Sequence, residues 1–246
     1  MAISRGPRIV TNGLVMALDA ADRNSYPGSG TAWFDLSGNG NHATIYNSPT
    51  WNAAGYFSLD GIDDYIKTTN ALNLSNNNKV TVVVIFQPKT YPGSGNAKCL
   101  CELTNNFNNF STSFCSFYND DSVSQNYEIS VNIKGNVGYN LGMWNKSNYN
   151  DLTWKNSTMF FDTSQSSSEV SLYVQGSPAT VIQNPLAGYA ANNTNNFAND
   201  NFYIAGRGGA SFFNDINLAS VLIYNRILSD AEISQNFNAS RARFGI

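Results

Sequence analysis

The sequence has few of the side chains on which most enzymes depend. Its 246 residues include one histidine and three cysteines. A Ser-His-Asp or Cys-His arrangement would have to use His42, which lies in a turn-rich stretch of glycine and asparagine. Glycosidases of the sandwich type need two carboxyl groups about 5 to 10 Å apart. No predicted strand offers such a pair, because the four glutamates stand alone at Glu102, Glu128, Glu169 and Glu232. We therefore predict a protein that is not an enzyme.

Charge is also scarce. Only 13% of the residues are charged, against roughly a quarter in ordinary soluble domains. The net charge of -3 provides no basic surface for nucleic acid. No stretch approaches the roughly 18 apolar residues that a bilayer-spanning helix needs, so we predict no membrane insertion. Asn12 and Gly13 interrupt the apolar stretch near the start, so we expect no signal peptide and synthesis in the cytoplasm.

The three cysteines are an odd number and too few for a disulfide scaffold. Cys99 and Cys101 are two residues apart, so on a strand they share one face and are expected to be buried as small apolar groups. A bridge to Cys115 or a metal site is the alternative. Zinc is disfavoured because His42 is distant and no paired cysteine motif exists. Free thiols fit a reducing cytosol.

Alternation of apolar and polar residues predicts many short strands. The β-branched run 80–86 is typical of a central strand. Segments 128–134 and 169–175 alternate, which predicts one wet and one buried face for each. Clusters of Asn, Gly, Ser and Pro separate these from further strands predicted at 9–18, 158–162, 201–205 and 217–225. Strands at this spacing indicate an all-β sandwich or barrel.

The last predicted strand runs directly into a predicted helix. Ser229 and Glu232 have the spacing of a capping box. Leu228, one residue before the cap, is placed to form a hydrophobic staple with Ile233. We therefore predict one short C-terminal helix.

Acidic side chains cluster at Asp60, Asp63 and Asp64, and Asp215 is a candidate tertiary neighbour. Carboxylates with nearby amide and carbonyl oxygens suit calcium, which takes 6 to 8 oxygen ligands. The alternative is turn chemistry, because Asp-Gly between two predicted strands is typical of a tight hairpin. The spacing matches no EF-hand loop. The sequence leaves both interpretations open.

Aromatic residues provide a candidate glycan site. A flat ring flanked by amide side chains can stack on a sugar face. One group, Trp144, Tyr149 and Trp154, falls among Asn, Lys and Gly residues and is our predicted site. A second group lies in a loop-rich region, at Tyr26, Trp33, Tyr46 and Trp51. Packing in the core or at its rim is the alternative for most of these rings.

The first eight residues are predicted to form an extended N-terminal arm. They contain Gly6 and Pro7 and precede the strand pattern. Such an arm can lie on a neighbouring subunit, so we predict Arg5 and Arg8 as partner contacts in a homo-oligomer. No linker divides the rest of the chain, and residues 9–246 are predicted to form a single domain.

Several motifs resemble a known family. They are the segments 13–21, 25–30, 33–41, 57–65 and 223–246. Together they resemble the laminin-G-like, concanavalin A-like jelly-roll proteins found among tailed-phage virion components. Residues 88–200 carry little that matches. The resemblance implies two antiparallel sheets in a jelly-roll sandwich, with the first and last strands close together.

The resemblance also implies a role. Our first prediction is a non-enzymatic protein of the virion surface, a capsid decoration or tail fibre subunit that contacts other virion proteins. The alternative is a calcium-dependent, lectin-like module that recognises a host surface polysaccharide. The two overlap, since a fibre can do both.

Overall fold

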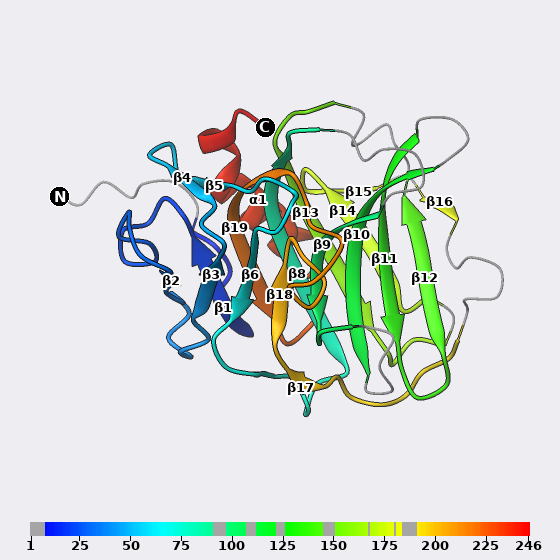
Figure 1. The fold of residues 1–246 in the computed structure, drawn as a ribbon. Coiled ribbons are helices and arrows are strands. Elements are labelled where there is room, and N and C mark those ends of the chain that lie inside the picture. The colour runs from blue at the N-terminus through cyan, green and yellow to red at the C-terminus, as the bar shows by residue number, and fades with distance from the viewer. Residues whose placement is uncertain are drawn as a thin grey trace.

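Two antiparallel β-sheets lie face to face in the computed structural model (Figure 1). The structure describes residues 8–90, 97–106, 112–121, 126–144, 151–166, 168–179, 181–183 and 191–246. The eight-stranded sheet has the order β15 (Ser177–Pro178), β14 (Val170–Val174), β13 (Lys155–Asp162), β8 (Lys79–Pro88), β19 (Ile216–Tyr224), β5 (Tyr56–Ser58) and β4 (Thr50–Asn52), and β1 (Leu14–Asp19) also pairs with β19.

The nine-stranded sheet covers the other side of the core. Its order is β16 (Val181–Gln183), β12 (Tyr139–Trp144), β11 (Asn126–Lys134), β10 (Ser113–Asp121), β9 (Ala97–Leu103), β18 (Phe202–Ile204), β6 (Tyr65–Thr68), β3 (Ala43–Tyr46) and β2 (Ala32–Trp33). A small pair, β7 (Leu72–Asn73) and β17 (Asn199–Asp200), and one helix, α1 (Asp230–Phe244), complete the described elements. The predicted all-β sandwich with a C-terminal helix is confirmed.

Aromatic and aliphatic side chains from both sheets form the core. Phe114 of β10 stacks on Phe161 of β13 with ring centroids 4.2 Å apart, so the ring pair joins the two sheets. The predicted central strand 80–86 lies within β8, which pairs with β13 and β19. It is buried on both faces because the nine-stranded sheet covers one and side chains near α1, including Ile233, pack on the other. This double burial explains the continuous β-branched run.

The C-terminal helix begins as its sequence predicts. Ser229 is the N-cap, and both hydrogen bonds of the capping box with Glu232 are present. Leu228 and Ile233 are buried in one apolar cluster. The first and last strands are neighbours, since β1 pairs with β19. The predicted strand 9–18 begins later than expected, at Leu14, because Thr11 accepts a hydrogen bond from Leu14 N–H in a preceding turn.

A β-bulge corrects the prediction that Cys99 and Cys101 share one face. Cys101 pairs with Ser116 and Cys99 pairs with Phe117, so Leu100 is an extra residue that turns the strand. Cys101 therefore lies in the main core, whereas Cys99 lies in a separate cluster with Cys115. All three thiols are free and buried, and burial raises the pKa of each.

The predicted wet face of β11 is also corrected. Ser130 and Asn132 lie opposite the core-facing residues of this strand, yet both are buried. Asn132 donates a hydrogen bond to Cys115 Sγ on β10 and another to Ser130 Oγ, so its amide nitrogen is paired within this face, whereas its Oδ1 is buried without a partner among the described residues. Alternation indicated which side chains point outward but not what covers them.

Candidate functional site

The loop between β5 and β6 holds the acidic cluster. Strand β5 belongs to the eight-stranded sheet and β6 to the nine-stranded sheet, so the loop crosses from one sheet to the other. The hairpin that we considered is therefore wrong, because the two strands do not pair. Carboxylate oxygens of Asp60, Asp63 and Asp64 lie within 4.8 Å of one another. The structure thus brings together three of the four predicted calcium ligands.

Hydrogen bonds within this loop fix two of the carboxylates. Asp60 Oδ1 accepts the main-chain N–H of Ile62 at 2.8 Å, and Asp64 Oδ2 accepts that of Asp60 at 3.0 Å. Asp64 is buried, whereas Asp60 and Asp63 are exposed. Burial, with the nearby charges of Asp60 and Asp63, raises the pKa of Asp64 to about 6. A bound cation would relieve this repulsion, and the oxygen spacing fits a hard ion.

Asp215, the fourth predicted ligand, has another partner. Its Oδ1 lies 2.7 Å from Lys89 Nζ, and Lys89 also donates to the carbonyl oxygen of Leu59 at 2.7 Å. Gly61 lies directly on Asp215, where an added Cβ would come within 2.9 Å of Asp215 Cβ. Asp215 therefore supports the loop through its ion pair with Lys89, which also binds Leu59. It is not one of the three clustered carboxylates. Calcium binding stays a prediction.

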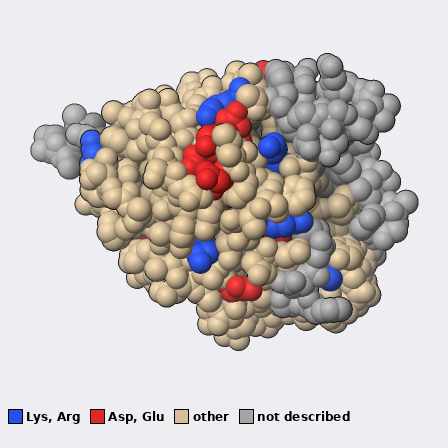
Figure 2. Space-filling view, viewed as in Figure 1, with Lys and Arg blue, Asp and Glu red and all other residues tan. Residues whose placement is uncertain are grey.

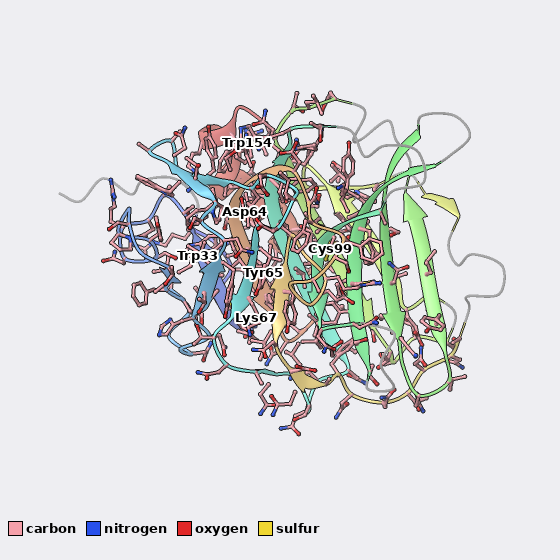
Figure 3. The ribbon with its side chains drawn as sticks, viewed as in Figure 1. Trp33, Asp64, Tyr65, Lys67, Cys99 and Trp154 are labelled. Atoms are coloured by element: carbon pink, nitrogen blue, oxygen red, sulfur yellow. The ribbon has the colours of Figure 1, made fainter. Side chains whose placement is uncertain are left out.

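Two tyrosines stack beside this loop on the outer face of the nine-stranded sheet. Tyr46 of β3 lies opposite Tyr65 of β6, and their rings are parallel within 2° with centroids 4.5 Å apart. Both rings face outward because the neighbouring Ile45 and Ile66 point into the core. Figure 3 places Tyr65 on β6 between Asp64 and Lys67. The acidic loop and the ring pair therefore form one continuous surface.

A half-buried lysine and a third tyrosine, which is largely buried, lie next to this ring pair along the sheet. Lys67 lies opposite Tyr203 of β18, and Lys67 Nζ is 5.6 Å from the ring centroid of Tyr46 and 5.9 Å from that of Tyr203. We call Tyr46, Tyr65, Lys67 and Tyr203 the tyrosine platform. Asn47 ties it to the acidic loop, since its Nδ2 donates to the Asp63 carbonyl oxygen at 2.7 Å.

The segment after β18 fixes the platform from the other side. Gly209 has φ of +69°, and an added Cβ would come within 2.5 Å of Tyr65 Cζ. Only glycine fits this left-handed, closely packed position. Phe213 lies near the same ring, with centroids 6.4 Å apart. Tyr65 is therefore packed between Tyr46 on one side and this segment on the other, which restricts the movement of its ring.

Trp154, one of the three predicted glycan residues, is not part of this platform. Trp154 packs against Tyr56 and Phe244, with centroids 5.5 and 4.5 Å away, beside a pocket of about 460 Å³ at the end of α1. Trp144 ends β12, and its side chain lies outside the described residues, as does Tyr149. Figures 1 and 3 show Trp154 near α1 and β12 at the far side of the molecule. Trp154 is therefore remote from β12.

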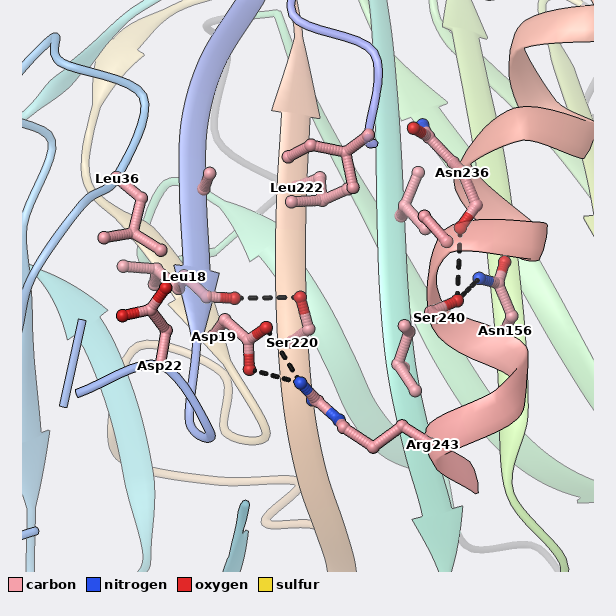
Figure 4. A pocket seen from close by; sticks show the side chains of 15 residues that line it. Leu18, Asp19, Asp22, Leu36, Asn156, Ser220, Leu222, Asn236, Ser240 and Arg243 are labelled. Atoms are coloured by element: carbon pink, nitrogen blue, oxygen red, sulfur yellow. Dashed lines mark hydrogen bonds and ion pairs between the residues drawn. The ribbon is translucent and has the colours of Figure 1, made fainter. Parts of the chain in front are cut away.

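A smaller pocket lies between α1 and the outer face of the eight-stranded sheet (Figure 4). Its volume is about 270 Å³, and Val83 and Leu222 line it on the sheet side. Its polar rim is satisfied internally, since Arg243 Nη1 donates to Asp19 Oδ1 at 2.8 Å and Ser220 donates to a main-chain oxygen. The pocket has room for a small group only.

The fold matches known structures of binding proteins and of an enzyme. Trypanosoma rangeli sialidase shares 17% identity and a TM-score of 0.61, over 98% of this chain and 36% of that one. The serotype D botulinum neurotoxin ligand binding domain in complex with N-acetylneuraminic acid shares 14% identity and a TM-score of 0.61, over 93% and 51%. The binding domain of botulinum neurotoxin DC in complex with rat synaptotagmin II shares 12% and 0.64, over 94% and 52%.

These similarities show the fold alone, and the chain spans about a third to a half of the length of those structures. No curated protein matches the sequence. No helix in the described part of the chain is long and apolar enough to cross a membrane. Residues 60–234 match the family model of the concanavalin A-like lectin/glucanases superfamily, and the chain belongs to that family.

Proposed function

We propose that the protein is a non-enzymatic, lectin-like module that binds a carbohydrate on its tyrosine platform. The observation that carries the proposal is the stacked pair Tyr46 and Tyr65, which the fold holds on an outer sheet face. Aromatic rings usually gain most by burial, so rings held rigidly at a surface suit recognition. The family supports the proposal, as does a structural neighbour that is in complex with a sugar.

The chemistry around the platform suits a sugar. A pyranose presents C–H groups that pack on a ring and hydroxyl groups that need hydrogen-bonding partners. Thr44 lies beside Lys67 on the same face, and its hydroxyl contacts that of Thr69 at 3.0 Å. Because Tyr46 and Tyr65 are ordered in advance, binding costs little side-chain entropy.

Replacing Tyr46 by alanine is expected to weaken glycan binding by tenfold or more. The change removes the outer ring of the stacked pair, and a loss of about 1.4 kcal/mol in binding corresponds to tenfold. A glycan array identifies the ligand, and calorimetric titration of the wild type and of Tyr46→Ala measures the difference.

Trp154→Ala is the matched control, because Trp154 is the described member of the other predicted glycan site. It removes an aromatic ring that packs on Tyr56 and Phe244 and on none of the platform residues, so binding should be unchanged. If Trp154→Ala abolished binding and Tyr46→Ala did not, the platform would be excluded as the site. An array without any bound glycan would contradict the lectin proposal itself.

We also propose calcium at the loop of Asp60, Asp63 and Asp64. Millimolar calcium should then raise the melting temperature by a few degrees, because an ion that binds only the folded state stabilises it. Scanning calorimetry with calcium and with a chelator measures the shift. Asp63→Asn should remove the response with little effect on the calcium-free protein, since Asp63 is exposed. Equal melting temperatures with calcium and with chelator would contradict calcium binding and would mean that the loop is only a turn.

The motif resemblance supports one further proposal, that this module sits on a tailed-phage virion as a decoration or fibre subunit. Residue 8 is anchored at α1, where Gln235 Nε2 donates to the Arg8 carbonyl oxygen at 2.7 Å, so an arm would start from a fixed point. Arg5 lies outside the described residues, and the division into an arm and one domain stays a prediction. The test is cosedimentation of the protein with phage particles. Deletion of residues 1–8 should weaken this cosedimentation.

A further inference from the structure

Lys67 is a cation that the described part of the protein does not neutralise. None of the ion pairs among the described residues involves it. Its Nζ lies between the rings of Tyr46 and Tyr203, at 5.6 and 5.9 Å from their centroids. The side chain is half-buried, so part of its usual freedom is already lost. The two rings therefore hold an ammonium group in a fixed place on the platform.

None of the acidic groups near the platform forms an ion pair with Lys67 in the part of the chain that the structure describes. Glu102 follows Tyr203 in the same row across the sheet, and its Oε2 accepts from Arg207 Nε at 3.0 Å. In the acidic loop, the carboxylates of Asp60 and Asp64 accept main-chain N–H groups, and Asn47 donates to the main-chain carbonyl oxygen of Asp63. Figure 2 shows a main acidic patch on this side of the molecule with basic side chains against its upper end, a smaller acidic spot lower down, and other basic side chains spread over the face. Among the four platform residues Lys67 thus carries the one positive charge, and the acidic loop lies beside it.

We propose that the platform selects an acidic sugar, whose carboxylate or sulfate group binds Lys67 while its ring packs against Tyr46. This inference rests on the proposed lectin function and names the class of its ligand. Cation–π contact leaves the N–H donors of the ammonium group available to an anion. Because Lys67 is held in advance, an anionic group gains a charge-assisted hydrogen bond at little entropic cost. A neutral sugar gains only the contact with the rings.

A glycan array with many acidic and many neutral members tests the inference directly. We expect binding to acidic glycans, and a carboxylate polymer, polygalacturonate, should compete better than its methyl-esterified form. Dextran sulfate against dextran tests sulfate in the same way, so the two pairs distinguish the two anions. Binding confined to neutral glycans would overturn this inference and leave the lectin function standing. An array without any bound glycan would overturn both.

Lysine variants then assign the effect to one side chain. Lys67→Gln should lower affinity for the bound acidic glycan about tenfold and flatten its dependence on salt, whereas Lys67→Arg should keep most of both. Lys79→Gln is the control for net charge, because Lys79 lies near Asp162 on the eight-stranded sheet. Equal losses in Lys67→Gln and Lys79→Gln would show a general charge effect and overturn the role of Lys67. The melting temperature of each variant shows that it is folded.

Discussion

Phe114→Ala is expected to cost the fold about 3 to 5 kcal/mol, as large aromatic truncations in closed cores do. Phe114 is fully buried, and its ring stacks on Phe161 of the opposite sheet at 4.2 Å. It also meets the edge of Phe197 at 5.4 Å. The alanine variant leaves a cavity lined by rigid rings from both sheets, which cannot close without moving the sheets together. Guanidinium unfolding measures the loss as a lower midpoint.

Phe34→Ala is the matched control for this prediction. It removes the same phenyl ring, but from a side chain that is 40% exposed. Its effect should stay near 0.5 kcal/mol, as for most surface changes. A loss below about 1 kcal/mol for Phe114→Ala would mean that the sheets repack around the gap. The packing between the two sheets would then adjust to a lost ring more easily than the close contact of Phe114 and Phe161 indicates.

Local sequence signals predicted the elements that depend on neighbours in the chain. The β-branched run in β8 and the Ser229 and Glu232 capping box are such signals, and both are confirmed. The face of Cys99 was wrong because a bulge depends on how β9 and β10 pair. The hairpin at residues 59–65 was wrong because the turn residues Asp60 and Gly61 also suit a crossing between sheets. Turn chemistry shows that the chain bends, not which sheet it enters.

The sequence likewise predicted one part of the candidate site and not the other. The three carboxylates are within five residues of one another, so sequence alone could bring them together. The platform could not be found in this way, because Tyr46, Tyr65 and Tyr203 come from three strands whose order is not local. Alternation in the segment Tyr65, Ile66 and Lys67 does predict that the tyrosine and lysine share a face. The register between strands, which stacks Tyr46 on Tyr65, is set by the whole sheet.

The second large effect is expected from Arg207→Met. Glu102 is fully buried, and Arg207 donates to its carboxylate at 3.0 Å while lying over Phe117 and Phe212 at 4.7 and 4.8 Å. Methionine keeps contact with the two rings but leaves the Glu102 carboxylate without this cation. Removing one partner of a buried ion pair costs about 3 to 5 kcal/mol. Thermal unfolding should show a melting temperature lower by about 10 °C.

The buried ion pair of Glu102 and Arg207 therefore helps to hold the segment that contacts Tyr65. Two further variants separate the effect of charge from that of packing. Adding Glu102→Gln to Arg207→Met should restore part of the lost stability, because a neutral amide is cheaper to bury than a carboxylate that has lost its cation. Arg23→Met is the control, since Arg23 lies over Trp51 at 4.8 Å and is exposed. It should change stability by less than about 1 kcal/mol. If Arg207→Met were equally mild, the pair would contribute little, and the segment that contacts Tyr65 would be held by its apolar contacts and main-chain hydrogen bonds.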